Sequence, residues 1–138
     1  MGSRRHSREY ALQMLYQQDL SGDPLPHVFE HYWRRQAEED AETREFAETL
    51  VRGVADQKEE IDVFIAKYST HWKLNRMAAV DKNILRMAVF ELKNCKDIPL
   101  RVTLNEAIEI AKKFGSEESG SFINGVLDKI AKEIKKEM

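Results

Sequence analysis

The sequence predicts an all-α protein, a compact bundle of about seven helices, and three observations support this fold class. Apolar residues recur at intervals of three and four over most of the chain, which is the spacing of one helix face. No segment shows the alternation of apolar and polar residues that is typical of a strand. Short connections that contain Gly, Pro, Ser or Asp separate the periodic segments. The 138 residues, 42% hydrophobic and 33% charged, are therefore expected to form a single domain, residues 1–138, with a buried core.

Residues 80–92, VDKNILRMAVFEL, are the most apolar of these segments and predict the central helix of the bundle. Their apolar side chains cover more than the single stripe of a surface helix, so we expect other helices on several sides. Asp81 lies in the predicted first turn, where the positive end of the helix dipole favours a carboxylate. Cys95 follows as the only cysteine, which excludes an internal disulfide and fits a reducing cytoplasm.

Four helices are predicted before the central one, at residues 3–20, 26–37, 41–57 and 59–68. Gly22 suits the left-handed position that ends the first of them, and Pro24 cannot continue a helix. Two helices are predicted after it, at residues 103–114 and 122–134. Thr103 is expected to cap the earlier one, with Glu106 completing a capping box, and Gly115 is expected to end it.

The net charge of −2 conceals a basic tip at the N-terminus. Residues 3–8, SRRHSR, hold Arg4, Arg5 and Arg8 and no acid, and they lie on the first turns of the first predicted helix. Arg4 and Arg8 are four residues apart and therefore share a helix face. Arginines on a helix neutralise phosphates and donate to base edges, so the basic tip predicts an anionic partner. A solubilising terminus is the alternative interpretation.

A smaller basic patch, Lys112 and Lys113, lies just before a polar turn at residues 116–121. The turn can present backbone N–H groups and hydroxyls to a ligand, and Phe122 can stack on an unpaired base. Taken alone, a phenylalanine at this helical spacing is more often part of the core. These features support a binding site better than a catalytic one.

One motif suggests a metalloenzyme, and the rest of the sequence argues against it. His27, Glu30 and His31 match H-x-x-E-H, in which two histidines bind zinc and the glutamate acts as a base. A catalytic zinc needs a third protein ligand and a substrate cleft, for which a short helix offers little room, and short motifs often match by chance. No glycine-rich phosphate loop, nucleophile motif or membrane-spanning apolar run is present, so the sequence predicts no enzyme, no cofactor and no membrane partner.

Four segments resemble the NusB family of transcription antitermination factors: ALQMLYQQDL, ILRMAVFEL, IPLRVTLNEAIEIAKKFG and SFINGVLDKI. They cover essentially the whole chain in order, and residues 105–107 and 122–127 are the most specific parts. The resemblance implies an all-helical, non-enzymatic protein of the bacterial cytoplasm. Members of the family bind the single-stranded boxA element of nascent ribosomal RNA together with NusE, a ribosomal small-subunit protein. With RNA polymerase and other factors they suppress premature termination.

The resemblance also implies roles for individual residues. It implies RNA contacts at Arg4, Arg5, Arg8, Glu117, Glu118, Ser119 and Phe122. It implies contacts with NusE at Tyr16, Asp81 and Arg86. His6 stands where the family often has arginine, and Asn75 stands where relatives can have an acid.

Other interpretations remain open on the sequence alone. The chain can be the NusB-like module of a ribosomal RNA methyltransferase, although it lacks a G-x-G cofactor loop, which favours a free-standing factor. It can also be a protein–protein adaptor whose basic tip is incidental. Both a monomer and a homodimer that covers its own RNA face are compatible with the sequence.

Overall fold

The computed structural model of the chain describes residues 2–36, 39–69, 73 and 76–137. These residues form seven helices and no strand, so the predicted fold class is confirmed. The helices are α1 (Gly2–Ser21), α2 (Leu25–Arg34), α3 (Ala41–Asp56), α4 (Lys58–Tyr68), α5 (Ala79–Asn94), α6 (Leu100–Phe114) and α7 (Ser119–Glu137).

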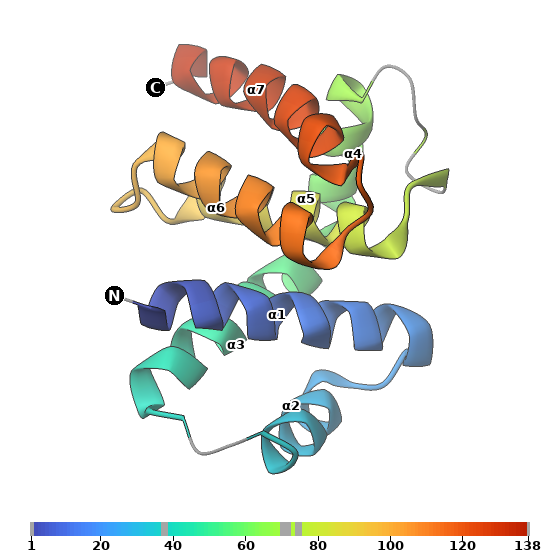
Figure 1. Cartoon of the computed structure of the whole chain (residues 1–138), viewed down its shortest axis with the longest axis vertical. Helices are drawn as coiled ribbons and strands as arrows, with labels where there is room; N and C mark the ends of the chain where they lie inside the picture. Colours follow the sequence, from blue (N-terminus) through green and yellow to red (C-terminus); the bar gives the residue numbers. More distant parts are fainter. Residues whose placement is uncertain (1, 37–38, 70–72, 74–75, 138) are drawn as a thin grey trace.

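The arrangement of the helices places α1 across the middle of the molecule, with α2 and α3 on one side of it and α6 and α7 on the other (Figure 1). The predicted central helix is confirmed, because α5 packs against α1, α3, α4, α6 and α7. Residues 83–92 of α5 are all buried. Three of them, Asn83, Arg86 and Glu91, are polar or charged and therefore need buried partners.

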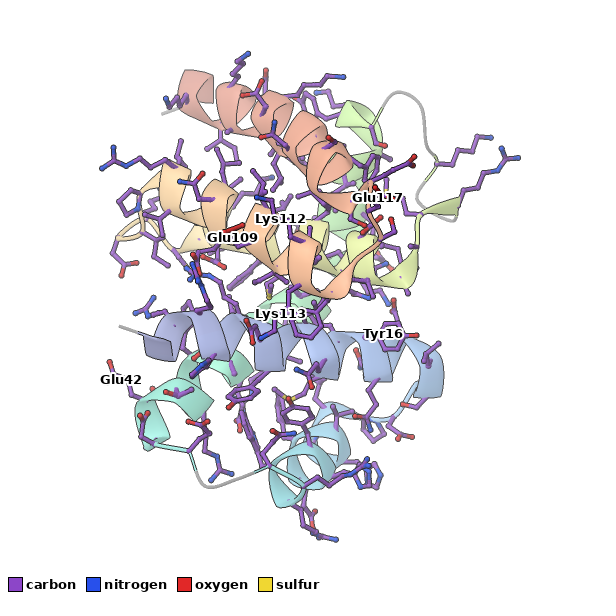
Figure 2. The ribbon with its side chains drawn as sticks, in the orientation of Figure 1. Tyr16, Glu42, Glu109, Lys112, Lys113 and Glu117 are labelled. Atoms are coloured by element: carbon purple, nitrogen blue, oxygen red, sulfur yellow. The ribbon has the colours of Figure 1, made fainter. Side chains whose placement is uncertain are left out.

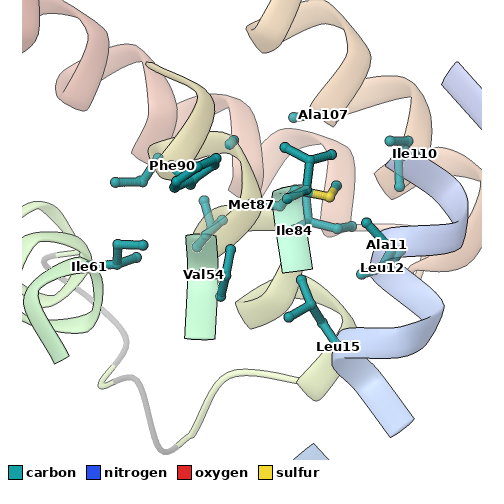
Figure 3. Packing of buried hydrophobic residues seen from close by; sticks show 14 of the residues in the cluster. Ala11, Leu12, Leu15, Val54, Ile61, Ile84, Met87, Phe90, Ala107 and Ile110 are labelled. Carbon is teal, nitrogen blue, oxygen red and sulfur yellow. The ribbon is translucent and has the colours of Figure 1, made fainter. Parts of the chain in front are cut away.

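The hydrophobic core is built around α5. This helix contributes Ile84, Met87 and Phe90, which belong to one buried cluster with Leu12 of α1 and Val54 of α3 (Figure 3). Burial of such side chains is the main favourable term in folding, so the core determines where the ends of α1 and α6 lie.

The helices α3 and α5 approach closely at Gly53. A Cβ atom at this position would lie 2.1 Å from Cε1 of Phe90, far inside van der Waals contact. Glycine is therefore required here by the space that the Phe90 ring occupies, because no side chain fits between the two helices.

The start of α6 differs from the prediction. This helix begins at Leu100, ahead of Thr103, and its N-terminus has no side-chain cap, so the predicted capping box is wrong. Thr103 Oγ1 instead donates to Glu91 at 3.2 Å, and Glu106 accepts hydrogen bonds from Arg5. Both side chains have partners on other helices, and these longer-range contacts replace the local cap.

The turn between α6 and α7 is shorter than predicted. Gly115 follows the last residue of α6, as expected, with an extended backbone (φ −92°, ψ −169°). Ser119 already belongs to α7, and its Oγ accepts a hydrogen bond of 2.9 Å from the backbone N–H of Ser116. The buried hydroxyl of Ser119 therefore stabilises the turn by accepting a hydrogen bond from its backbone.

The end of α1 agrees with the prediction. Gly22 has φ 71°, the left-handed conformation expected of a glycine at this position. The helix α2 ends at Arg34, and its predicted end, Ala37, lies outside the described residues. None of the helices in the described part of the chain is long and apolar enough to cross a membrane.

The substitution Gly53→Ala is expected to lower the free energy of unfolding by about 1–3 kcal/mol, because the added methyl group overpacks the Phe90 ring. Urea unfolding followed by circular dichroism measures this change. Gly125→Ala on α7 is the matched control, since a Cβ atom there meets nothing within 4 Å. Alanine is the better helix former by about 0.5–1 kcal/mol, so the control should be as stable as the wild type or more stable. Equal losses of unfolding free energy in both variants would contradict the close approach of α3 and α5 at Gly53.

Candidate functional site

The basic tip on the first turns of α1 presents two exposed arginines. Arg4 lies over the Phe46 ring, with Cζ 3.9 Å from the ring centroid. Arg5 donates from Nε and Nη2 to the two carboxylate oxygens of Glu106 on α6, at 3.0 and 2.6 Å. These hydrogen bonds raise the pKa of Arg5 and hold the pKa of Glu106 below its usual value. Half of the Arg5 side chain, 52%, stays exposed, so solvent reaches this ion pair.

Arg8, the third arginine of the basic tip, is buried, with 4% of its side chain exposed. Its Nε and Nη2 donate to the carboxylate of Glu91 on α5, both at 2.8 Å. Its Nη1 lies 3.7 Å from Glu106, and Thr103 also donates to Glu91. Arg8 therefore joins α1 to α5 and α6, and in this structure it is not accessible to the RNA contact expected of it.

A groove of about 480 Å³ separates the basic tip from α6. Lys113 Nζ pairs with Glu9 of α1 across it at 2.9 Å, and Lys112 Nζ lies 3.3 Å from Glu109 on its own helix. A second groove, of about 470 Å³, adjoins the first because Lys112 lines both, and it continues to Ser116 beside α7. Figure 2 shows Glu109, Lys112 and Lys113 along α6 on one face of the molecule.

The second region expected to contact RNA surrounds the start of α7. Glu117 and Glu118 are exposed, whereas Ser119 is 1% exposed and engaged within the turn. Glu118, Ser119 and Phe122 line a pocket of about 190 Å³, and Asp81 at the start of α5 lines it as well. The structure therefore brings Asp81, expected at the NusE surface, into one pocket with residues expected to contact RNA.

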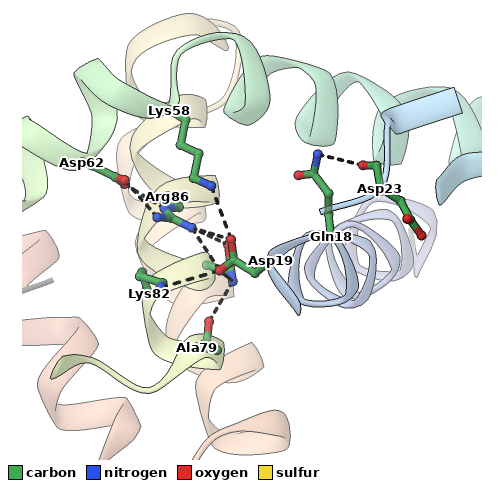
Figure 4. Close-up of polar contacts among 9 residues, drawn as sticks. Gln18, Asp19, Asp23, Lys58, Asp62, Ala79, Lys82 and Arg86 are labelled. Carbon is green, nitrogen blue, oxygen red and sulfur yellow. Dashed lines mark hydrogen bonds and ion pairs between the residues drawn. The ribbon is translucent and has the colours of Figure 1, made fainter. Parts of the chain in front are cut away.

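The other residues expected at the NusE surface differ in exposure. Tyr16 is 39% exposed on α1 (Figure 2). Arg86 is only 4% exposed: its Nε and Nη2 donate to Asp62 at 2.7 and 2.9 Å, and its Nη1 donates to Asp19 at 3.2 Å (Figure 4). Arg86 is therefore an internal side chain that joins α5 to α4 and α1. Asn75 lies outside the described residues.

Asp19, whose side chain is 15% exposed, is the centre of a second, largely buried network. Its carboxylate accepts hydrogen bonds from Arg86 and Asn83, and it lies 3.4 Å from Lys58 Nζ and 3.7 Å from Lys82 Nζ (Figure 4). Burial alone would raise the pKa of Asp19, but the hydrogen bond from Asn83 and the charge of Arg86 lower it. The ionised carboxylate thus fixes the C-terminal half of α1 to α5.

The two histidines of the H-x-x-E-H motif lie on one face of α2. The rings of His27 and His31 are stacked, with their centroids 6.1 Å apart. His27 Nε2 lies 3.7 Å from Asp23, and Glu30 pairs with Arg34. Among the residues that the structure describes, no three His, Cys, Asp or Glu side chains are grouped so as to hold a metal ion. The zinc interpretation therefore finds no third ligand in the described ranges.

The expected site residues do not include Glu9, Glu91 and Glu106, although these acids hold the cations of the site. The sequence does contain a signal for Glu91 and Arg86, because a charged residue in a helix that is covered on all sides needs a buried partner. Glu9 carries no such signal, since its partner on α6 is 104 residues away.

Comparisons with known proteins all find similarity to NusB proteins over nearly the whole chain. The NusB family model matches residues 5–132. The transcription antitermination protein NusB of Anaeromyxobacter dehalogenans is 49% identical over 132 residues, which cover 95% of this chain and 92% of that protein. NusB of T. maritima superposes with a TM-score of 0.87 at 41% identity, covering 94% of this chain and 91% of that one. A structure of the antitermination factors NusB and NusE in complex with dsRNA gives a TM-score of 0.87 at 31% identity, covering 96% and 98%.

Arg8→Ala is expected to lower the free energy of unfolding by about 3–5 kcal/mol, because it leaves the carboxylate of Glu91 buried without its partner. Arg34→Ala is the matched control: it removes an exposed ion pair with Glu30 and should cost no more than about 0.5 kcal/mol. Chemical denaturation of both variants measures the difference. Similar small losses would show that the Arg8–Glu91 pair does not hold the helices together.

Asp19→Asn is expected to lower the free energy of unfolding at neutral pH by about 1.5–3 kcal/mol, because it removes a charged acceptor of Arg86. The pKa of Asp19 in the folded protein lies below its ordinary value of 3.8, so its stabilisation is present above that pH and is lost as the pH falls below it. The difference between wild type and variant should therefore shrink from neutral pH to about pH 3 in urea unfolding.

The exposed acid Asp128, paired with Lys132, provides the control for this pH dependence. Asp128→Asn should change the free energy of unfolding by no more than about 0.5 kcal/mol at either pH. A difference between wild type and Asp19→Asn that stays the same at both pH values would contradict the lowered pKa.

Proposed function

Because the chain belongs to the NusB family, we propose that it acts as a transcription antitermination factor that binds RNA together with NusE. Its RNA is the single-stranded boxA element of nascent ribosomal RNA, and it acts with RNA polymerase in the bacterial cytoplasm. One observation carries the proposal: the exposed Arg5 stands at one end of two grooves that share Lys112, and the second of these grooves shares Ser116 with the pocket that Phe122 lines.

This arrangement of grooves and pocket suits single-stranded RNA better than double-stranded RNA. Guanidinium and ammonium groups along α1 and α6 meet the phosphates, which gives an affinity that depends on salt. The ring of Phe122 offers a stacking surface for an unpaired base, as sites for single-stranded RNA commonly do. In this proposal Arg8 and Arg86 support the site from inside, and Arg4 and Arg5 carry the direct contacts.

The need for a second protein follows from the ion pairs of the groove. To bind phosphates, Arg5 exchanges Glu106 for a phosphate, and Lys113 exchanges Glu9. Each exchange replaces one charge-assisted contact by another, so RNA alone gains little affinity. NusE adds contacts of its own, and Tyr16, an exposed aromatic residue on α1, is our candidate for its surface.

The alternatives are less well supported. The relatives described above are antitermination proteins, which favours this function over the RNA-binding module of a methyltransferase. A zinc hydrolase at His27, Glu30 and His31 lacks a third ligand among the described residues. If the protein is a pure protein–protein adaptor, replacing Arg4 and Arg5 should leave every interaction intact, whereas the proposed function predicts weaker RNA binding.

Fluorescence anisotropy with a labelled boxA RNA and a scrambled RNA tests the proposal, with and without NusE and over a range of salt concentrations. We expect a preference for boxA that increases when NusE is added. For a variant with Arg4→Gln and Arg5→Gln, the slope of log affinity against log salt should become shallower by about 1.4, because two phosphate contacts on a single strand are lost.

The matched control is Arg34→Gln with Arg35→Gln, which removes two exposed arginines from the end of α2. It should leave both the preference and the slope unchanged. No preference for boxA with or without NusE would overturn the proposed function and favour the adaptor.

A further inference from the structure

Two arginines of the basic tip, Arg5 and Arg8, lie next to one carboxylate, that of Glu106 on α6. Arg5 donates from Nε and Nη2 to both oxygens of this carboxylate, at 3.0 and 2.6 Å. Nη1 of Arg8 lies 3.7 Å from Oε1 of Glu106, which is too long for a hydrogen bond. Glu106 therefore has a complete partner in Arg5 and a second cation within reach in Arg8.

The two arginines differ in what can reach them. The side chain of Arg5 is 52% exposed, whereas that of Arg8 is 4% exposed and donates from Nε and Nη2 to Glu91. A phosphate that arrives from solvent can therefore bind Arg5 but not Arg8. To accept hydrogen bonds from both Nε and Nη2 of Arg5, the phosphate has to displace Glu106, because the oxygens of that carboxylate already occupy these nitrogens.

A displaced Glu106 needs a new partner. Its side chain is only 15% exposed, so a carboxylate without a cation would be costly at this position. Arg8 can provide the partner, because a movement of about 1 Å brings Oε1 of Glu106 to hydrogen-bond distance of Nη1. Glu91 does not compete for that nitrogen, since it accepts from Nε and Nη2. The carboxylate can thus pass from the surface arginine to the buried one.

We propose that Glu106 is an internal competitor of RNA at Arg5, and that its carboxylate moves to Nη1 of Arg8 when an RNA phosphate binds Arg5. This inference rests on the proposed function and adds a destination for the displaced carboxylate. Every strand that binds Arg5 has to displace Glu106, so this contact lowers the affinity for all RNA by a similar factor. The buried Arg8 gains a hydrogen bond when RNA binds, although RNA does not touch it.

The variant Glu106→Gln tests the competition. Glutamine has nearly the same shape as glutamate but no charge, so it binds Arg5 more weakly. In fluorescence anisotropy without NusE, the variant should bind boxA RNA and scrambled RNA about 3- to 5-fold more tightly than the wild type does, the range for an ion pair that solvent reaches. The ratio of the two affinities should stay as it is in the wild type.

Glu109→Gln is the matched control, because it removes one negative charge from the same helix three residues later (Figure 2). Glu109 lines the groove beside the basic tip, but it pairs with Lys112 of its own helix, at 3.3 Å. Both side chains of that pair are largely exposed, so its loss should change the RNA affinity by no more than about 2-fold. An equal gain in the two variants would show that only the total charge matters, and would overturn the inference.

The gain in affinity also has to depend on Arg5. In a double-mutant cycle, adding Glu106→Gln to Arg5→Gln should leave the RNA affinity within about 2-fold of that of Arg5→Gln alone, because the arginine that Glu106 occupies is already absent. A gain that persists without Arg5 would contradict the competition.

Nuclear magnetic resonance of protein with 15N-labelled arginine side chains tests the movement to Arg8. When boxA RNA is added to the wild type, the guanidinium signals of the buried Arg8 should shift, because Nη1 gains a charged acceptor. In Glu106→Gln the shift should be much smaller. Wild-type signals of Arg8 that stay unchanged at saturating RNA would overturn the movement, and this measurement needs no variant that has to fold.

The outcomes separate this inference from the proposed function. Wild-type protein that prefers boxA, with a Glu106→Gln variant that binds RNA as well as or more weakly than the wild type, would show that Glu106 positions Arg5 for RNA. The inference would then be wrong and the proposed function would stand. Wild-type protein that binds neither RNA, with or without NusE, would overturn both.

Discussion

The buried ion pair between Arg8 and Glu91 is the interaction on which the candidate site depends. Two charges leave water at a cost that only good geometry offsets, and two N–H···O bonds of 2.8 Å provide that geometry. The pair fixes the first turns of α1 against α5. Arg5 lies one turn earlier on the same helix and can therefore reach Glu106 on α6. One arginine of the basic tip thus anchors the helix, while its neighbours face solvent.

A second network fixes the other half of α1. Asp19 accepts hydrogen bonds from Arg86, which also donates to Asp62 on α4. Both α1 and α6 pack against α5, so α5 sets the distance between them, and long side chains such as Lys113 and Glu9 span the gap. The groove therefore exists before any ligand binds. Preformed sites of this kind spend less binding free energy on ordering the protein.

The sequence predicts most of the fold and only part of the site. Helix number, the central helix and the left-handed Gly22 follow from periodicity and local backbone chemistry, which a single sequence contains. The capping box failed because Thr103 and Glu106 have partners on α5 and α1, and local rules do not include such partners. The burial of Arg8 could not be predicted from the sequence either, because it depends on Glu91, which lies 83 residues away. Sequence patterns identify which arginines are present, and tertiary packing decides which of them a ligand can reach.

The acidic character of the protein is consistent with binding RNA selectively. With a net charge of −2, the chain gains little from overall attraction to a polyanion. Glu9 and Glu106 already occupy Lys113 and Arg5, so a strand that offers only phosphates replaces one anion by another. The carboxylates therefore lower the affinity for any strand that offers phosphates alone, so selectivity for one RNA has to come from contacts other than these ion pairs.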